Sequence, residues 1–477
     1  GLVKLSQKKG RGGTYFMEKQ QVTVQEKTNL KVGFCYSFGE IGSQMSWYMI
    51  NQYLTIFYTD VVGLTAVAVS AIMLIARIWD AANDPMMGMI ADRTNTRWGK
   101  FRPYLMFAPP FLAVFNILTF TVFPVTGMTK VLLCLVCYIG AGMAYTVVCI
   151  TYGSLVNRIA RDSQVRMNYT SARGIGGAVI QFILGAVAMP MILFFGNSDV
   201  PNARGYFVTT VICSIVMIPC FWLCAAGCKE TVVVEKPVAD QKKRPFLQSL
   251  KMVLKNDQLR ITVFCVFMGS IAIMGRMSLL TYYAIYVVGS AAVIAPLFST
   301  MTAFQFIGTL ILPWTTKVFG KKNWLIFLNV IQIIGFIIMF LVPANNLPFL
   351  IAVSAVIGLA NSASNICTGM LSDCVEYGDW KYGVREEGVT YSFLSFGVKL
   401  ATAVAGSVGV LLIAATGYVP NVEQTEAAKM GINAVVNLLP AACILISVIP
   451  VFFYKLDKKM MDKIRVEIDA RNAAKAE

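Results

Sequence analysis

An arginine and two aspartates stand near the middle of an apolar segment that is long enough to cross a membrane. They are Arg77, Asp80 and Asp84. Asp80 and Asp84 are four positions apart, so a helix presents both carboxylates on one face, with Arg77 one turn before Asp80. Ionised groups at this depth are costly unless they are paired, hydrated or bound to an ion. One arginine cannot neutralise two acids, which leaves the second acid for a cation or a proton; the alternative is a structural triad that is neutral within itself.

The lack of histidine narrows the chemistry that this cluster can support. The chain has no histidine, which excludes a histidine proton relay, a histidine metal site and a Ser-His-Asp triad. Its twelve cysteines do not form two Cys-x-x-Cys motifs at zinc-binding spacing, and most stand in apolar segments as small core residues. We therefore predict no catalytic residues and no organic cofactor, and expect that the chain is not an enzyme. Any coupling chemistry must rest on carboxylates.

The elements that position these residues are membrane-spanning helices. The chain is 57% hydrophobic and only 14% charged, with a mean hydropathy of +0.64, whereas soluble domains carry about 25% charged residues. Twelve apolar segments near the roughly 20 residues needed to span a bilayer follow one another. They lie at about 31–58, 65–90, 104–124, 130–156, 170–196 and 205–228, and then at 259–288, 291–317, 324–343, 347–372, 389–416 and 430–454.

The only long polar connection, about 229–258, separates the two groups of six segments. The pattern predicts an all-α polytopic membrane protein with twelve transmembrane helices in two six-helix bundles, which meet at a binding site near the midplane. The predicted parts are a cytoplasmic N-terminal segment, a first bundle, a central cytoplasmic loop, a second bundle and a cytoplasmic amphipathic tail, at 1–29, 30–228, 229–258, 259–455 and 456–477.

The basic residues predict the orientation. The net charge of +16 does not indicate a nucleic-acid partner, because the basic residues recur between apolar segments. With a cytoplasmic amino terminus, only Lys130, Arg204 and Lys429 fall in outward connections. We therefore expect a bacterial cytoplasmic membrane protein with both termini inside. Met17 opens an ordinary cytoplasmic start, so residues 1–16 are excluded from the fold prediction, and whether they are native stays open.

An ordered set of motifs resembles the glycoside-pentoside-hexuronide:cation symporters of the major facilitator superfamily, the melibiose-carrier family. The resemblance covers residue 30 to the tail. It is carried by Tyr58-Thr59-Asp60-Val61-Val62-Gly63-Leu64, by the stretch from Arg77 to Pro85, by Arg97-Trp98-Gly99-Lys100-Phe101-Arg102-Pro103, and by Tyr152-Gly153-Ser154-Leu155, Lys255-Asn256-Asp257, Gly320-Lys321-Lys322-Asn323, Asp373 to Gly378, Tyr391-Ser392 with Lys399, and Gly417-Tyr418.

The resemblance implies a cation site for Na⁺ or H⁺. Asp80 and Asp84 match the family's cation-site carboxylates, and Thr146 matches a hydroxyl ligand of the same site. Hard Na⁺ takes oxygen ligands, and the same oxygens suit a proton. Asn83 either orients Asp84 or packs on the lipid side. Apart from Na⁺ at this site, no metal is expected.

The resemblance also implies a sugar site. Arg173 and Lys399 match positions implicated in substrate binding or in charge balance near the cation, and Arg276 is a third intramembrane base. Tyr145 is an aromatic residue that a sugar ring could stack on, although interfacial aromatic belts use the same residue types.

Three positions depart from the melibiose type. That type has carboxylates where this chain has Gln44 and Cys149, and a tryptophan where it has Gly153. The glucuronide and oligoglycoside branch is resembled more closely by the Tyr-Gly-Ser-Leu run, by Glu376-Tyr377-Gly378 and by the tail segment Val466-Glu467-Ile468-Asp469. Arg173 with Arg276 could pair with the carboxylate of a hexuronide. Arginine also binds neutral vicinal hydroxyls, so the charge of the sugar stays open.

A further set of charged residues is expected to form an inner gate. Gly88-x-x-x-Asp92-Arg93 resembles the superfamily's motif between the second and third helices, with ordinary positive-inside charge as the alternative. Asp373 and Glu376 stand on the otherwise basic inner side. We expect them to pair with bases of other inner loops, Arg385 among them, when the cavity faces outward; a solvated loop is the alternative.

The leading prediction is symport of a glycoside, an oligosaccharide, pentoside or hexuronide, with H⁺ or Na⁺ by alternating access. The alternatives are an uncoupled sugar facilitator and a Na⁺-dependent lysolipid transporter of the same fold. A membrane-embedded enzyme is disfavoured by the lack of histidine and of any phosphate-binding loop. The expected partners are a small sugar and the lipid bilayer, and the sequence does not indicate the oligomeric state.

Overall fold

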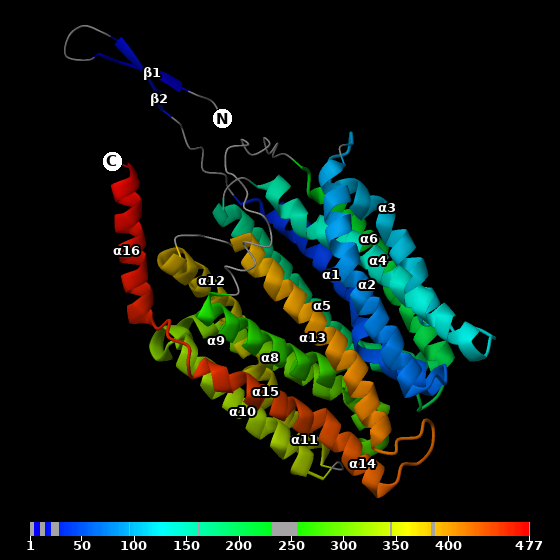
Figure 1. Cartoon of the computed structure of the whole chain (residues 1–477). Coiled ribbons are helices and arrows are strands. Elements are labelled where there is room, and N and C mark those ends of the chain that lie inside the picture. Colours follow the sequence, from blue (N-terminus) through cyan, green and yellow to red (C-terminus); the bar gives the residue numbers. More distant parts are fainter. Residues whose placement is uncertain are drawn as a thin grey trace.

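The computed structural model of the chain describes residues 4–9, 15–20, 28–94, 96–160, 163–230, 255–343, 346–382 and 387–476. Most of the central loop predicted at 229–258 therefore lies outside the described residues. The helices form two bundles that lie side by side, with the first half of the chain in blue to green and the second in green to red (Figure 1). A hairpin of two antiparallel strands, β1 (Lys4–Lys9) and β2 (Tyr15–Gln20), stands apart from the helices.

The first bundle is built from the helices before the central loop. They are α1 (Leu30–Ile56), continued by the π-helical turn η1 (Phe57–Val61), α2 (Ala66–Arg93), α3 (Arg102–Thr119), α4 (Gly127–Ile159), α5 (Ser163–Gly196) and α6 (Ala203–Gly227).

The second bundle repeats this layout with more interrupted helices. Its elements are α8 (Asp257–Tyr282), η2 (Tyr283–Val288), η3 (Ala291–Val293), α9 (Ile294–Phe319), α10 (Lys321–Leu341), α11 (Leu347–Asn361), α12 (Ala363–Tyr382), α13 (Glu387–Ala415), α14 (Glu426–Asn433), η4 (Ala434–Leu438) and α15 (Leu439–Val451). The tail forms α16 (Lys458–Ala476), whose Met461 and Ile464 are buried against this bundle.

Among the described residues, nine helical segments are long and apolar enough to cross a membrane by length and composition. These nine are all from α4 onward. α1 to α3 run alongside them in the first bundle (Figure 1). α2 holds Arg77, Asp80 and Asp84 in its middle.

Close approach of α4 to α2 depends on a glycine. A Cβ atom built on Gly142 of α4 would lie 2.8 Å from Oδ1 of Asp80. Only a residue without a side chain leaves this carboxylate its place between the two helices. Asp80 is thus positioned both by its own helix and by a small residue on the neighbouring helix.

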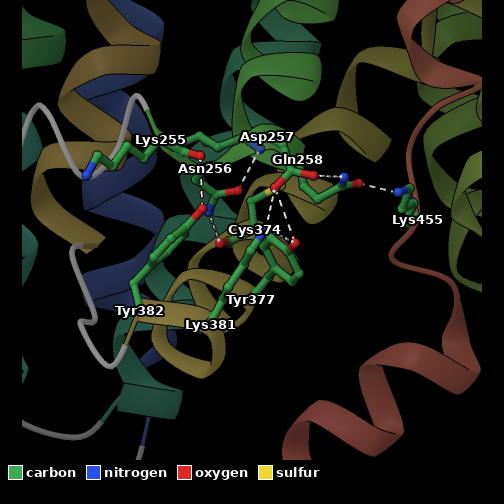
Figure 2. A network of polar contacts seen from close by, with 10 residues as sticks. Lys255, Asn256, Asp257, Gln258, Cys374, Tyr377, Lys381, Tyr382 and Lys455 are labelled. Carbon is green, nitrogen blue, oxygen red and sulfur yellow. Dashed lines mark hydrogen bonds and ion pairs between the residues drawn. The ribbon is translucent and has the colours of Figure 1, made fainter.

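The start of α8 is fixed to α12 by the Lys255-Asn256-Asp257 motif (Figure 2). Asn256 caps α8 by accepting from the backbone N–H of Leu259 at 3.1 Å, and its amide donates to the carbonyl of Cys374 at 2.9 Å. Asp257 accepts from Lys381 and from the hydroxyl of Tyr377, both at 3.2 Å. These bonds give the motif a structural role, because they hold the start of the second bundle against its own α12.

The two bundles contact each other through α1 with α8, α2 with α13, and α5 with α9. α13, in orange, runs between the bundles (Figure 1). Charged residues on the facing sides of α2 and α13 can therefore interact across the interface, and this is where the candidate site lies.

Candidate functional site

Asp84 of α2 lies at the interface between the bundles. One of its carboxylate oxygens, Oδ1, accepts a hydrogen bond from the hydroxyl of Thr146 on α4 at 3.0 Å. The other oxygen, Oδ2, forms an ion pair with the ammonium of Lys399 on α13. Two of the predicted cation-site residues therefore meet, and a base from the opposite bundle completes the contact.

Asp80 lies one turn away and is paired within its own helix. Nη1 of Arg77 donates to Oδ2 of Asp80 at 3.4 Å, and Asp80 is only 8% exposed. Each of the two acids therefore has a basic partner, because Lys399 pairs with Asp84 while Arg77 pairs with Asp80. The spacing along α2 could not by itself reveal a base from a distant helix, and only the family resemblance placed Lys399 near the cation.

Asn83 lies beside Asp84 on the same helix. Its amide nitrogen is buried and has no hydrogen-bond partner among the described residues. No hydrogen bond from this nitrogen orients Asp84, so that alternative for Asn83 receives no support.

A second cluster on the first bundle centres on Glu40 of α1. Its Oε2 accepts from Nε of Arg173 on α5 at 2.6 Å, and its Oε1 accepts from the amide of Gln44 at 3.2 Å. The Arg173 guanidinium also lies 4.9 Å from the centre of the Tyr152 ring. Arg173 and Gln44 are thus brought together as predicted substrate residues, through a carboxylate that the sequence analysis did not single out.

Two aromatic rings join this cluster to the acidic residues of α2. Trp47 of α1 and Tyr145 of α4 stack with their centres 4.2 Å apart and their planes 18° apart. The guanidinium of Arg77 lies 5.3 Å from the centre of the Trp47 ring. Aromatic side chains with a small number of polar groups beside them are typical of small-molecule binding sites.

Arg276 of α8 lies elsewhere. It is 5% exposed, and its contacts are with Met301 of α9 and Phe336 of α10, inside the second bundle. The structure does not bring it to the Glu40 cluster, although the sequence analysis grouped it with Arg173. The sequence shows how deep in the membrane a charged residue lies, but it does not show which side of the helix faces the interface between the bundles.

Asp60, which the sequence analysis did not assign, ties the two bundles together at the end where η1 and η2 lie. Its carboxylate accepts hydrogen bonds from the hydroxyls of Tyr286 and Tyr418, in the second bundle. Beside it, the hydroxyls of Thr59 and Tyr282 lie 2.7 Å apart, and the amide of Asn421 donates to the backbone carbonyl of Asp60 at 2.6 Å. We call these six residues the outer clamp, because the orientation predicted from the sequence places this end of the bundles outside.

The chemistry of the outer clamp depends on its tyrosines staying protonated. Tyr418 lies in the connection between α13 and α14. Burial raises the pKa of Tyr418, and the neighbouring Asp60 carboxylate raises it further. Its hydroxyl is therefore a donor throughout the physiological pH range.

The predicted inner gate is described only in part. Asp373 of α12 is buried and accepts from the ammonium of Lys321, at the start of α10, at 2.6 Å. Glu376 is one turn further along α12. Arg385 and the side chains of Asp92 and Arg93 lie outside the described residues, so the proposed pairing across the inner side stays a prediction.

Glu40 and Asp60 could have been found from the sequence. Glu40 is an acid inside the first apolar segment, and the rule applied to Asp80 and Asp84 applies to it as well. Asp60 stands inside the Tyr58 to Leu64 motif, which the sequence analysis used only for the resemblance. The distant partners Tyr286 and Tyr418 carried no such signal, because tyrosines are common at the ends of spans.

The chain is similar in sequence to known transport proteins. The profile of the MFS/sugar transport protein family matches residues 35–458. The isoprimeverose transporter of Lactiplantibacillus pentosus is 32% identical over 444 residues, which cover 92% of this chain and 91% of that protein. A glucuronide carrier protein homolog of Escherichia coli strain K12 is 30% identical over 443 residues, covering 91% and 94%.

A solved structure is similar in fold. It is a bacterial homolog of the human lysosomal transporter Spinster, in an inward-facing and unoccupied conformation. Its TM-score is 0.64 at 13% sequence identity, over 91% of this chain and 97% of that one. At this identity the likeness concerns the arrangement of the helices alone.

Proposed function

The chain belongs to the MFS/sugar transport protein family, and on that premise we propose that it carries an uncharged glycoside together with H⁺ or Na⁺. The observation that carries the proposal is the contact of Asp84 with Thr146 and with Lys399. This contact places a cation-binding carboxylate between the two bundles, where its occupancy can affect how the bundles move.

The cation and Lys399 compete for the same carboxylate. In the structure the ammonium of Lys399 neutralises Asp84, so the two acids and two bases of the site carry no net formal charge. Either Na⁺ bound to Asp84, Asp80 and the Thr146 hydroxyl or a proton on Asp84 neutralises the negative charge that attracts the ammonium of Lys399. Cation binding thereby releases α13 from α2, which couples the ion to the movement of one bundle against the other.

The sugar binds beside the cation, at the Glu40 cluster and the stacked rings. Trp47 and Tyr145 offer an aromatic face, while Glu40, Gln44 and Arg173 offer acceptors and donors for hydroxyl groups. The charge of Arg173 is already balanced by Glu40. A carboxylate-bearing sugar would have to displace Glu40 and leave that acid unpaired, so this pairing favours an uncharged glycoside over a hexuronide.

Alternating access follows from breaking contacts on one side at a time. On this proposal the hydrogen bonds of the outer clamp hold the outer side closed, and they have to break when the sugar enters from outside. Opening exposes the Asp60 carboxylate to water, which compensates for the lost tyrosine hydrogen bonds. We place the protein in the bacterial cytoplasmic membrane with both termini inside, on the distribution of its basic residues.

The proposal is tested by uptake of labelled glycosides into proteoliposomes that hold the purified protein. Uptake is measured against Na⁺ at constant pH, against pH without Na⁺, and at a fixed membrane potential. A response to at least one of the two ions is expected. A flat response to both would contradict coupling and would favour the uncoupled facilitator.

The charge of the sugar is tested by paired ligands. Binding of a glucoside and of the matching glucuronide is compared in the wild type and in Arg173→Gln. We expect the wild type to bind the glucoside more tightly than the glucuronide. Arg173→Gln should weaken glucoside binding about tenfold or more, as expected for the loss of a charge-assisted hydrogen bond. A wild-type preference for the glucuronide that Arg173→Gln removes would assign the arginine to an anionic sugar instead.

A further inference from the structure

Arg276 is a buried cation without a counter-charge in the part of the chain that the structure describes. It lies near the middle of α8 and is only 5% exposed. Two of its guanidinium nitrogens, Nε and Nη2, have no hydrogen-bond partner among the described residues. The third, Nη1, lies 3.8 Å from the sulfur of Met301, and the guanidinium is 5.2 Å from the centre of the Phe336 ring. Neither contact supplies a negative charge.

Such an arrangement is unstable unless something else is bound. Arginine stays protonated in proteins, so it cannot become neutral as a buried lysine can. A buried charge with no partner is among the most destabilising features that a protein interior can hold. Two free N–H donors on one planar group also point to a particular ligand, namely a compact acceptor that carries negative charge.

A small cavity adjoins the guanidinium. It has a volume of about 10 Å³ and is lined by residues of α8, α9, α10 and α11, Gln332 and Asn361 among them. A second cavity of about 70 Å³ shares Ile273, Gln332 and Asn361 with the first and extends to Asn329 and Ser270. Both belong to the interior of the second bundle. Polar side chains thus connect Arg276 to a space that can hold several water-sized particles.

The size of the space excludes a sugar. Ligand pockets for molecules of that size have volumes of roughly 300–1,000 Å³. The smaller cavity matches a single atom or water, and a water molecule would not neutralise the guanidinium. The amide nitrogen of Gln332 donates one N–H to Asn361 at 3.5 Å, which leaves its second N–H for a ligand. We propose that Arg276, with this second N–H of Gln332, holds one small monovalent anion of the halide type inside the second bundle. Chloride is the abundant ion of this class.

The anion site is separate from the proposed sugar and cation sites. Its residues belong to α8, α9, α10 and α11, whereas the Glu40 cluster and the two aspartates lie on the first bundle. The anion would keep four helices of the second bundle packed around a charge that they cannot balance themselves. Loss of the anion is expected to weaken the helix packing of the second bundle and to leave the first bundle unchanged.

The test measures binding of radiolabelled chloride to the purified full-length protein in gluconate buffer. We expect saturable binding of one chloride per chain. Arg276→Met, which keeps the length of the side chain without its charge, should reduce the affinity at least about tenfold. Arg204→Met is the matched control, since Arg204 is an exposed arginine in the first turn of α6, and it should bind chloride like the wild type.

Each remaining result counts for or against the proposal. The absence of saturable chloride binding in the wild type would overturn it, as would unchanged binding in Arg276→Met. Displacement of chloride by a glucoside or glucuronide would assign Arg276 to the sugar site and overturn a separate anion site. If Arg276→Met does not fold, bromide is soaked into crystals of the wild type. An anomalous peak at the guanidinium supports the proposal, and no peak there overturns it.

Discussion

The interaction energy between Lys399 and Asp84 can be measured by a double-mutant cycle. Lys399→Met and Asp84→Asn each remove one charge while keeping the approximate size of the side chain. Either change alone leaves an unbalanced charge at the interface between the bundles, whereas the double variant removes both charges together. We therefore expect each single variant to be less stable than the wild type, and the double variant to regain part of the loss.

The magnitude follows from the partial burial of the pair. The side chain of Lys399 is 38% exposed and that of Asp84 is 23% exposed. Exposed pairs contribute about 0–1 kcal/mol, and breaking a fully buried pair costs about 3–5 kcal/mol. Solvent screening of this half-exposed pair places its interaction energy between these limits, at about 1–3 kcal/mol.

The assay is thermal unfolding of the purified variants in detergent, with and without Na⁺ and at two pH values. In the wild type the cation replaces Lys399, so the cation should stabilise Lys399→Met more than it stabilises the wild type. Lys429→Met, at an exposed pair with Glu426 of the same helix, is the matched control and should change little. Strictly additive effects of Lys399→Met and Asp84→Asn would refute the reasoning, because they would mean that the two charges do not interact.

Three further variants test the remaining parts of the site. Glu40→Gln should weaken glucoside binding about tenfold or more and reduce the difference in affinity between glucoside and glucuronide, because Arg173 then loses its counter-charge. Equilibrium binding of both ligands measures this effect, and unchanged affinities for both would contradict it. Trp47→Leu should weaken glucoside binding by about 0.5–1.5 kcal/mol through the lost stacking while leaving the Na⁺ or pH response intact, and a lost ion response would place Trp47 at the cation site instead. Asp60→Asn should favour the outward-open form, seen as faster labelling of a cysteine introduced in the outer half of the cavity, whereas slower labelling would mean that the outer clamp does not hold the outer side closed.

The sequence predicted the family and the general fold, and both predictions are confirmed. The resemblance drawn from the motifs agrees with the family profile over residues 35–458. The all-α membrane fold agrees with the helices of the structure and with the transporter structure of similar fold. Hydrophobic length is a property of one segment at a time, so it can be read without knowing the neighbours of that segment.

Partners from distant helices were harder to predict. The spacing of Asp80 and Asp84 showed that both carboxylates share a face of α2. That spacing did not show that Lys399 of α13 pairs with Asp84, and only the family resemblance placed this lysine near the cation. For Arg276 the sequence suggested a contact that the structure does not have. Its depth in the membrane suggested the sugar site, whereas its side chain faces the interior of the second bundle. The rotation of a helix about its own axis is decided by packing, and an amphipathic pattern is too weak to reveal it in a helix that is apolar on most sides.

The central claim is that a cation at Asp84 drives the sugar across the membrane, and gradient-driven uptake tests it most directly. Proteoliposomes with an inward Na⁺ or H⁺ gradient are given a labelled glucoside, and its internal and external concentrations are compared for the wild type and Asp84→Asn. The account predicts that the wild type accumulates the glucoside above its external concentration, whereas Asp84→Asn still binds it but brings it only to equilibrium. Accumulation by Asp84→Asn at the level of the wild type would contradict the claim.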